Sequence, residues 1–169
     1  MTGPTPTVVV SDERSDTDSP DVPIVVDRWT RLAFAVLADI GVEGELTLTF
    51  VDRDDIAELN AEHMGKTGAT DVLSFPMDDQ PLEGVPTLLG DVVISPAVAA
   101  DQYADHAGTL DDELALLVVH GILHVLGHDH AEPDEAAIMR ARELDLLERL
   151  HWHGPAPVGF RQVHDESPP

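Results

Sequence analysis

Short stretches of this chain alternate apolar with polar residues, and this period of two predicts β-strands. The clearest alternation lies at 46–50, where leucine and phenylalanine are separated by threonine. A valine run at 8–10 and the segments 70–76 and 91–94 predict three further strands. The sequence therefore predicts a four-stranded sheet.

Other stretches repeat apolar residues every three or four positions, which predicts amphipathic helices. The first covers 29–40 and stops at Gly41. Capping residues and first-turn prolines mark where the later helices begin. These residues are Asp52, Ser95, Pro96, Thr109 with Asp112, and Pro133. The apolar stripe of the last helix consists of Ala137, Ala141, Leu144 and Leu147.

The segment 114–126 is apolar on nearly every side, which indicates a buried helix. It carries His120 and His124, and residues four apart lie on one face of a helix. Both imidazoles can therefore point at one place. Gly127 suits a left-handed stop, after which the chain turns back and presents His130 from a third direction.

Three imidazoles that converge and leave one position for water form the arrangement of a catalytic zinc site. A lone histidine in an apolar stretch is more often a hydrogen-bonded core residue. Burying several without partners costs roughly a few kcal/mol each, whereas one ion satisfies all three. The chain has no cysteine, which argues against a structural site closed by thiolates. We expect one Zn²⁺ on His120, His124 and His130, although imidazole also accepts other transition metals.

The remaining histidines receive no metal-binding role. His128 directly follows the turn glycine, and the residue two positions later already serves as the third ligand. His63 is expected on a helix surface. His151, His153 and His164 lie at or beyond the end of the last helix and are expected at the surface.

The spacing of the three histidines matches the metzincin proteases, with one decisive difference. Those enzymes place a glutamate directly after the first histidine, as the general base for water. The corresponding residue here is Gly121, so the usual proteolytic route loses a proton shuttle typically worth about a hundredfold or more. Metal-assisted hydrolysis of other bonds survives this loss, because a bound metal can still activate water or polarise a phosphoryl oxygen.

The run HGILHVLGHDH at 120–130 resembles the histidine signature of the YbeY family of bacterial endoribonucleases and ribosomal RNA maturation factors. Two further segments resemble the same family, TDVLSFP at 70–76 and LGDVVI at 89–94. The resemblance covers roughly Val22 to Trp152. It implies a zincin-like α+β fold with zinc on the three histidines. It also implies single-strand-specific cleavage during small-subunit ribosomal RNA maturation and ribosome quality control.

The fold expected from pattern and resemblance together is α+β and zincin-like. A mixed four-stranded sheet packs against about five helices, and a central buried helix carries the metal histidines. Ser74 and neighbouring backbone amides are expected to line the substrate groove, by analogy with zincin-like sites. Asp129 is expected either to accept a hydrogen bond from a histidine or to serve the turn.

The chain departs from the family at a position thought to serve catalysis. Many members carry an arginine soon after the Leu-Asn pair that precedes TDVLSFP, and here this place falls at Met64. A thioether cannot hold a phosphate as the fork of guanidinium donors does. Lys66 is the only lysine in the chain and the nearest cation, so it is expected to take over part of the phosphate contact. A solvent-exposed loop lysine is the alternative.

A chain of 169 residues is long enough for a single domain, 1–169, with a core at about 22–152. The acidic, serine-rich stretch 11–20 is expected to be a mobile segment, and the proline-containing stretch 153–169 a loose tail. No apolar stretch approaches the roughly 20 residues of a membrane span, and the start lacks the features of a secretory signal. Without cysteine, the expected location is the cytoplasm.

Among the features of the sequence, the formal net charge of −24 is the one that fits RNA binding least well. Proteins that grip phosphate backbones unaided normally show basic patches. No such run is present, although folding can gather Arg28, Arg31, Arg53 and Lys66. The acidity either complements basic proteins of the small ribosomal subunit or serves solubility.

The predicted function is a zinc-dependent endoribonuclease that acts on single-stranded ribosomal RNA, with no membrane or DNA partner. Whether water or the RNA 2′-hydroxyl attacks stays open. One alternative is a non-catalytic ribosome-assembly factor whose metal supports the fold. The other is a metalloprotease-like hydrolase, which Gly121 opposes.

Overall fold

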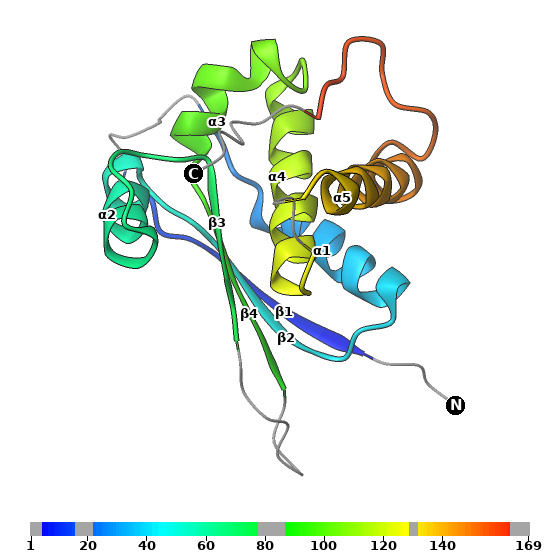
Figure 1. The fold of residues 1–169 in the computed structure, drawn as a ribbon, viewed down its shortest axis with the longest axis horizontal. Coiled ribbons are helices and arrows are strands. Elements are labelled where there is room, and N and C mark those ends of the chain that lie inside the picture. Colours follow the sequence, from blue (N-terminus) through cyan, green and yellow to red (C-terminus); the bar gives the residue numbers. More distant parts are fainter. Residues whose placement is uncertain (1–4, 16–21, 78–86, 129–131, 163–169) are drawn as a thin grey trace.

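The computed structural model describes residues 5–15, 22–77, 87–128 and 132–162 (Figure 1). They form an α+β fold in which a mixed four-stranded sheet is accompanied by five α-helices. The predicted numbers of strands and α-helices are therefore confirmed for this part of the chain.

The sheet has the spatial order β1-β2-β4-β3, so β1 and β3 are its edges. Strands β1 and β2 are parallel, as are β2 and β4, whereas β3 runs antiparallel to β4. The predicted alternation holds best in β2, whose three large apolar side chains are fully buried. The strands are β1 (Pro6–Asp12), β2 (Gly44–Phe50), β3 (Val72–Pro76) and β4 (Leu88–Ile94).

Predicted capping residues begin two of the helices. The Ser95 hydroxyl accepts a hydrogen bond from the Val98 N–H at 3.4 Å, and the Thr109 hydroxyl accepts one from the Asp112 N–H at 3.1 Å. A single 3₁₀ turn, Tyr103–Asp105, precedes α4, and a π-helical turn, Glu148–Trp152, follows α5. The α-helices are α1 (Val26–Ile40), α2 (Arg53–Met64), α3 (Pro96–Gln102), α4 (Leu110–Val125) and α5 (Pro133–Leu147).

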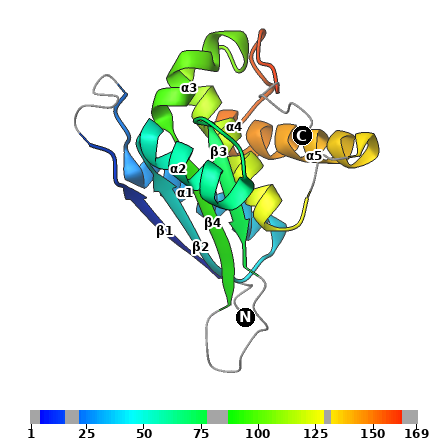
Figure 2. The same ribbon diagram turned by 60° about the vertical axis from the view of Figure 1, so that its left-hand side comes forward.

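Two apolar clusters lie on opposite faces of the sheet. The larger one joins α1, α4 and α5 to the sheet, and α4 is buried along most of its length because it lies between these layers (Figure 1). The smaller one joins Ile56 of α2 to Leu73 and Val93 on the other face, where α2 covers the sheet (Figure 2). Because strand side chains alternate, Ser74 and Val92 face α4 instead.

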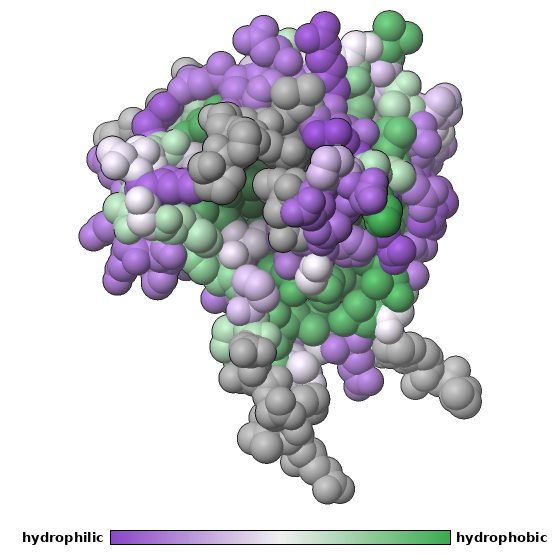
Figure 3. Space-filling view, in the orientation of Figure 1, coloured by the Kyte–Doolittle hydropathy of each residue, from purple (hydrophilic) through white to green (hydrophobic). Residues whose placement is uncertain are grey.

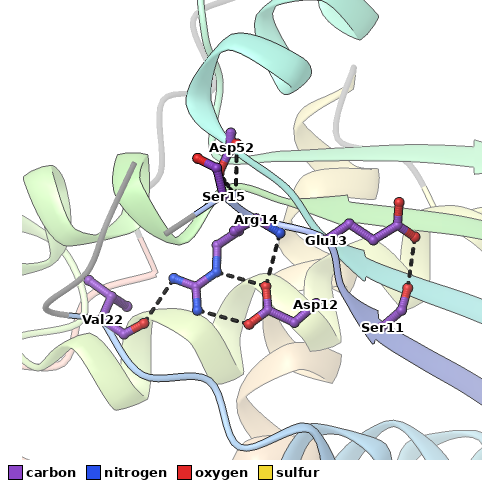
Figure 4. A network of polar contacts seen from close by, with 7 residues as sticks. All are labelled: Ser11, Asp12, Glu13, Arg14, Ser15, Val22 and Asp52. Atoms are coloured by element: carbon purple, nitrogen blue, oxygen red, sulfur yellow. Dashed lines mark hydrogen bonds and ion pairs between the residues drawn. The ribbon is translucent and has the colours of Figure 1, made fainter. Parts of the chain in front are cut away.

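The segment 11–20 differs from its prediction at its start. Strand β1 continues through Asp12, and Arg14 donates both to Asp12 and to the Val22 carbonyl oxygen (Figure 4). The hydrogen bond that the Arg14 side chain donates to Asp12 lowers the pKa of the Asp12 carboxyl group. The Ser15 N–H donates to the Asp52 carboxylate at 2.9 Å. Residues 11–15 of the predicted mobile segment thus make defined contacts, whereas residues 16–20 lie outside the described residues, and mobility of the stretch stays a prediction.

The same contact corrects the role of Asp52. This residue precedes α2 as predicted, but its side chain makes no capping hydrogen bond to that helix. The carboxylate accepts from Ser15 instead. Asp52 thus ties the chain after β1 to the start of α2, a contact between residues far apart in sequence.

The chain after the last helix makes defined contacts at residues 153–162, the described part of the predicted loose tail. The Phe160 ring contacts the edge of Trp152 at a centroid distance of 4.7 Å, and Phe160 packs against the larger core. The Ala156 N–H donates to the Glu148 carboxylate at 3.0 Å. Residues 163–169, including His164, lie outside the described residues.

The buried stripe of α5 also differs from the prediction. Ala137 and Ala141 are exposed, and the buried positions begin one residue earlier on the helix. Leu147 is buried as predicted, but Ala137 and Ala141 lie off the buried face, whose stripe includes a charged residue. Its members are Ala136, Met139, Glu143, Leu146 and Leu147.

No helix among the described residues combines the length and the apolar character required to cross a bilayer. Hydrophilic residues cover much of the upper and outer surface in Figure 3, and a hydrophobic area lies below them. Exposed side chains such as Phe34 and Ile138 show that apolar groups also reach the surface on α1 and α5.

The cap of α4 provides a test of this local structure. We expect Thr109→Ala to lower the free energy of unfolding by about 1 kcal/mol, because the Asp112 N–H loses its acceptor. Thr109→Ser keeps the hydroxyl and serves as the control. Urea denaturation monitored by circular dichroism measures both, and equal stability of the alanine and serine variants would contradict the cap.

Candidate metal centre

Helix α4 brings the rings of His120 and His124 together. Their centroids lie 4.5 Å apart with an interplanar angle of 76°, as one turn of helix requires. His120 is 5% exposed, and His124 is partly buried. The two imidazoles therefore share one face near the C-terminal end of the buried helix α4.

The buried carboxylate of Glu143 on α5 contacts His120 through its Oε2 atom and the ring Nδ1. Glu143 is 1% exposed, so this contact is shielded from water. The ring nitrogen of His120 that meets this carboxylate is thus Nδ1. A carboxylate on the second ring nitrogen is the usual companion of a metal-binding histidine, since it fixes the tautomer and the ring orientation.

Sequence reasoning missed Glu143. The available signal was a glutamate at the spacing of the buried stripe of α5, between Met139 and Leu146. A carboxylate in such a position needs a partner, because burying an unpaired charge is costly. What the sequence could not supply was the identity of the partner on another helix.

The helix stop after His124 has the predicted left-handed glycine. Gly127 has φ of 102°, its N–H donates to the His124 carbonyl oxygen, and the His128 N–H donates to the Leu123 carbonyl oxygen at 2.9 Å. These two bonds form a Schellman motif, which turns the chain sharply. Asp129 and His130 follow immediately and lie outside the described residues, so their predicted roles stay predictions.

The missing glutamate after the first histidine has a steric reason. A Cβ atom on Gly121 would lie 2.5 Å from Cγ1 of Val92 on β4, too close for any side chain to fit without movement. Next to this contact, the Ser74 hydroxyl donates to the Gly121 carbonyl oxygen at 3.1 Å. This position faces the sheet, so it cannot present a carboxylate to the histidine pair.

The predicted phosphate-binding region lies in the loop between α2 and β3. Gly65 ends α2 in a left-handed conformation, and Lys66 follows it with an exposed side chain. Met64, at the place of the family arginine, is 42% exposed. His63 is at the surface of α2, as expected, and its ring contacts the edge of Phe75 at 5.2 Å.

A second group of residues could hold a metal ion. Ligand atoms of Asp111, Asp112 and His151 all lie within 4.8 Å of one another. The predicted surface position of His151 is wrong, because its side chain is only 6% exposed and its Nε2 lies 2.8 Å from Asp112 Oδ1. Arg28 pairs with Asp111 at 2.5 Å, and a guanidinium there opposes the binding of another cation.

Two of the four positive charges that folding was expected to gather form ion pairs with nearby carboxylates. Arg28 is engaged by Asp111, and Arg53 lies 2.7 Å from Asp101 on α3. Arg28 and Arg31 do line a common surface pocket of about 490 Å³ beside α1. Arg28 and Arg53 are thus engaged in ion pairs, and Arg28 and Arg31 share one pocket.

The fold and this site define an α+β protein that places two adjacent histidines on a buried helix beside the edge strand of a mixed sheet. A sequence model of the family described as Endoribonuclease YbeY matches residues 12–151. The chain belongs to that family. The resemblance of the three motifs is thus confirmed over most of the chain.

Relatives in this family are identical to the chain at almost half of the aligned positions. An "Endoribonuclease YbeY" of Mycolicibacterium gilvum is 48% identical over 118 residues, which cover 65% of this chain and 66% of the relative. The protein of the same name from Thermobifida fusca is 46% identical over 134 residues, covering 75% and 86%. The chain thus spans just under two thirds of the first relative's length.

A solved structure supports the fold independently. The solution structure of TM1509 from Thermotoga maritima superposes with a TM-score of 0.56, covering 96% of this chain and all of that one. Sequence identity is 21%, so this likeness concerns the fold alone.

The close contact at Gly121 gives a direct test of the helix position. We expect Gly121→Ala to lower the free energy of unfolding by about 1–3 kcal/mol, although alanine favours helices over glycine by about 1 kcal/mol. The physical reason is the overlap of the new Cβ with Val92. Denaturant unfolding provides the measurement.

The control for this test is the same substitution in a Val92→Ala background, which removes the opposing methyl groups. The added cost of Gly121→Ala should then shrink or disappear. An equal cost in both backgrounds would show that Val92 is not what excludes a side chain.

Proposed function

We propose that this protein is a zinc-dependent endoribonuclease with a zincin-like centre formed by His120, His124 and His130. The observation that carries the proposal is the pair of neighbouring imidazoles on α4, of which His120 is buried and contacts Glu143. Membership of the Endoribonuclease YbeY family supplies the reaction class.

The donor set suits zinc. Imidazole nitrogen is a preferred zinc ligand, and because Glu143 contacts Nδ1 of His120, the proposed ligand atom of that ring is Nε2. When bound, zinc would lower the pKa of water and polarise a phosphoryl oxygen. The chain's own residues then have the tasks of orienting the ligands, holding the RNA and limiting access of water.

The edge strand β3 is the proposed wall of the RNA groove. Its partner β4 lies on one side only, so the backbone groups of its outer edge are open to a ligand. The Ser74 hydroxyl is bonded to Gly121 across to α4, so Ser74 holds the strand against the helix. Backbone amides near Ser74 are then the groups that contact the substrate.

The proposed substrate is single-stranded ribosomal RNA. Splayed bases and a bent backbone reach a site beside an edge strand more easily than a duplex does. With a net charge of −24, a partner that supplies positive charge suits this protein, and basic proteins of the small ribosomal subunit have that chemistry. The proposed setting is the cytoplasm, in maturation and quality control of the small ribosomal subunit.

The first test is metal-dependent cleavage of single-stranded RNA. We expect purified protein to cleave it, a chelator to abolish cleavage and added zinc to restore it. His124→Ala should show no cleavage at any zinc concentration, because the ion loses a ligand. His153→Asn, which alters an exposed histidine, serves as the matched control.

Equal cleavage by the wild-type protein and His124→Ala would assign the activity to a contaminating nuclease and reject the proposal. Products that end in a 2′,3′-cyclic phosphate would identify the RNA 2′-hydroxyl as the nucleophile.

Lys66 is proposed to contact an RNA phosphate in place of the family arginine. We expect Lys66→Ala to lower kcat/KM for RNA by about tenfold, the worth of one charge-assisted hydrogen bond. Lys66→Arg should retain activity, and Arg161→Ala removes an exposed charge as the control. Unchanged cleavage by Lys66→Ala would leave Lys66 as a solvent-exposed loop residue.

A non-catalytic assembly factor is the second candidate, and the exposed Met64 in place of an arginine favours it. In that case His124→Ala would weaken folding and ribosome association together, while the wild-type protein would not cleave RNA. Protease activity is opposed by the packing of Gly121 against β4, which leaves no room for the usual glutamate.

A further inference from the structure

The C-terminal segment 153–162 lies beyond the family match and returns to the helices that support His120. Its backbone is fixed at two points, where Ala156 donates to the Glu148 carboxylate and Arg161 donates to the His106 carbonyl oxygen at 3.1 Å. Phe160 anchors it on Trp152. The segment is therefore held in a defined position beside α5.

Gln162 connects this segment to the histidine pair. Its side-chain amide donates to the Arg140 carbonyl oxygen at 2.7 Å and to Oε1 of Glu143 at 3.2 Å. The other carboxylate oxygen of Glu143, Oε2, contacts Nδ1 of His120. The two oxygens of one buried carboxylate are thus shared between the C-terminal segment and a proposed metal ligand.

We propose that Gln162 is a positioning residue that strengthens metal binding by fixing Glu143, and through it the ring of His120. The inference rests on the metal centre proposed above. A terminal carboxylate torsion is broad, so a donor on Oε1 restricts the rotation that would carry Oε2 away from the imidazole. The carbonyl oxygen of Arg140, one turn earlier on α5, fixes the amide of Gln162 in turn.

The expected size of the effect follows from how many hydrogen-bonded residues separate each group from the proposed ligand His120. Residues that hydrogen-bond a metal ligand typically change metal affinity by about 10–100-fold when they are removed. Glu143 contacts the proposed ligand His120 directly, whereas Gln162 contacts Glu143 and reaches His120 only through it. We therefore expect about tenfold or more for Glu143 and about threefold to tenfold for Gln162.

The experiment measures the zinc dissociation constant of the full chain by competition with a chromophoric chelator. Gln162→Met keeps the length of the side chain and removes the amide donor, so zinc binding should weaken about threefold to tenfold. Gln162→Lys restores a donor and should recover most of the affinity. Arg161→Met is the matched control, because this neighbouring side chain is exposed.

Two further measurements separate positioning from packing. Urea unfolding in the presence of chelator should show that Gln162→Met is still folded without the ion, so that weaker zinc binding reports the metal centre and not unfolding. The visible spectrum of the cobalt-substituted protein should change in Gln162→Met and not in Arg161→Met, because it reports ligand geometry.

The outcomes distinguish this inference from the proposed function. If Glu143→Gln weakens zinc binding while Gln162→Met binds as tightly as the wild-type protein, Gln162 has no positioning role and the metal centre stands. Weaker binding by Arg161→Met to the same extent would also overturn the inference. If His124→Ala and the wild-type protein bind zinc equally, the metal centre itself is wrong.

Discussion

The approach of α4 to the sheet at Gly121 is the constraint on which the site depends. Here the helix backbone comes close enough to Val92 that no side chain fits between them, and Ser74 closes the contact with a hydrogen bond. With Gly121 against the sheet, the preceding residue, His120, is rotated by about 100° around the helix. The His120 ring is therefore directed towards α5, where its Nδ1 contacts the Glu143 carboxylate.

This packing also decides which carboxylate can contact the first histidine of the pair, His120. In the metzincin pattern, the carboxylate follows the first histidine on the same helix and acts on water. Here that position is sterically closed, and a carboxylate from another helix contacts the ring nitrogen on the far side instead. A carboxylate in this second position orients the ligand and leaves proton transfer to other groups. The difference separates the proposed centre from the metzincin pattern on physical grounds.

Several of the cations in this strongly acidic protein are paired with carboxylates. Arg149 spans the end of α5 and α1 by pairing with Asp145 and Asp39, and this hydrogen bonding lowers the pKa of the Asp39 carboxyl group. Ion pairs at exposed sites contribute little stability, but they reduce the positive charge open to a phosphate backbone. An RNA-cleaving role for this chain thus favours a few local contacts or a basic partner.

The sequence by itself determined the elements and the histidine pair, because period, capping residues and the spacing of His120 and His124 are local properties of the chain. It also identified the helix stop at Gly127, where a left-handed glycine closes the motif. Tertiary structure decided the rest, since it depends on residues far apart in sequence. Examples are the partner of His120, the true buried face of α5 and the packed C-terminal segment. Contacts between helices depend on which faces meet, and a single buried carboxylate such as Glu143 shifts that choice in a way that local periodicity does not reveal.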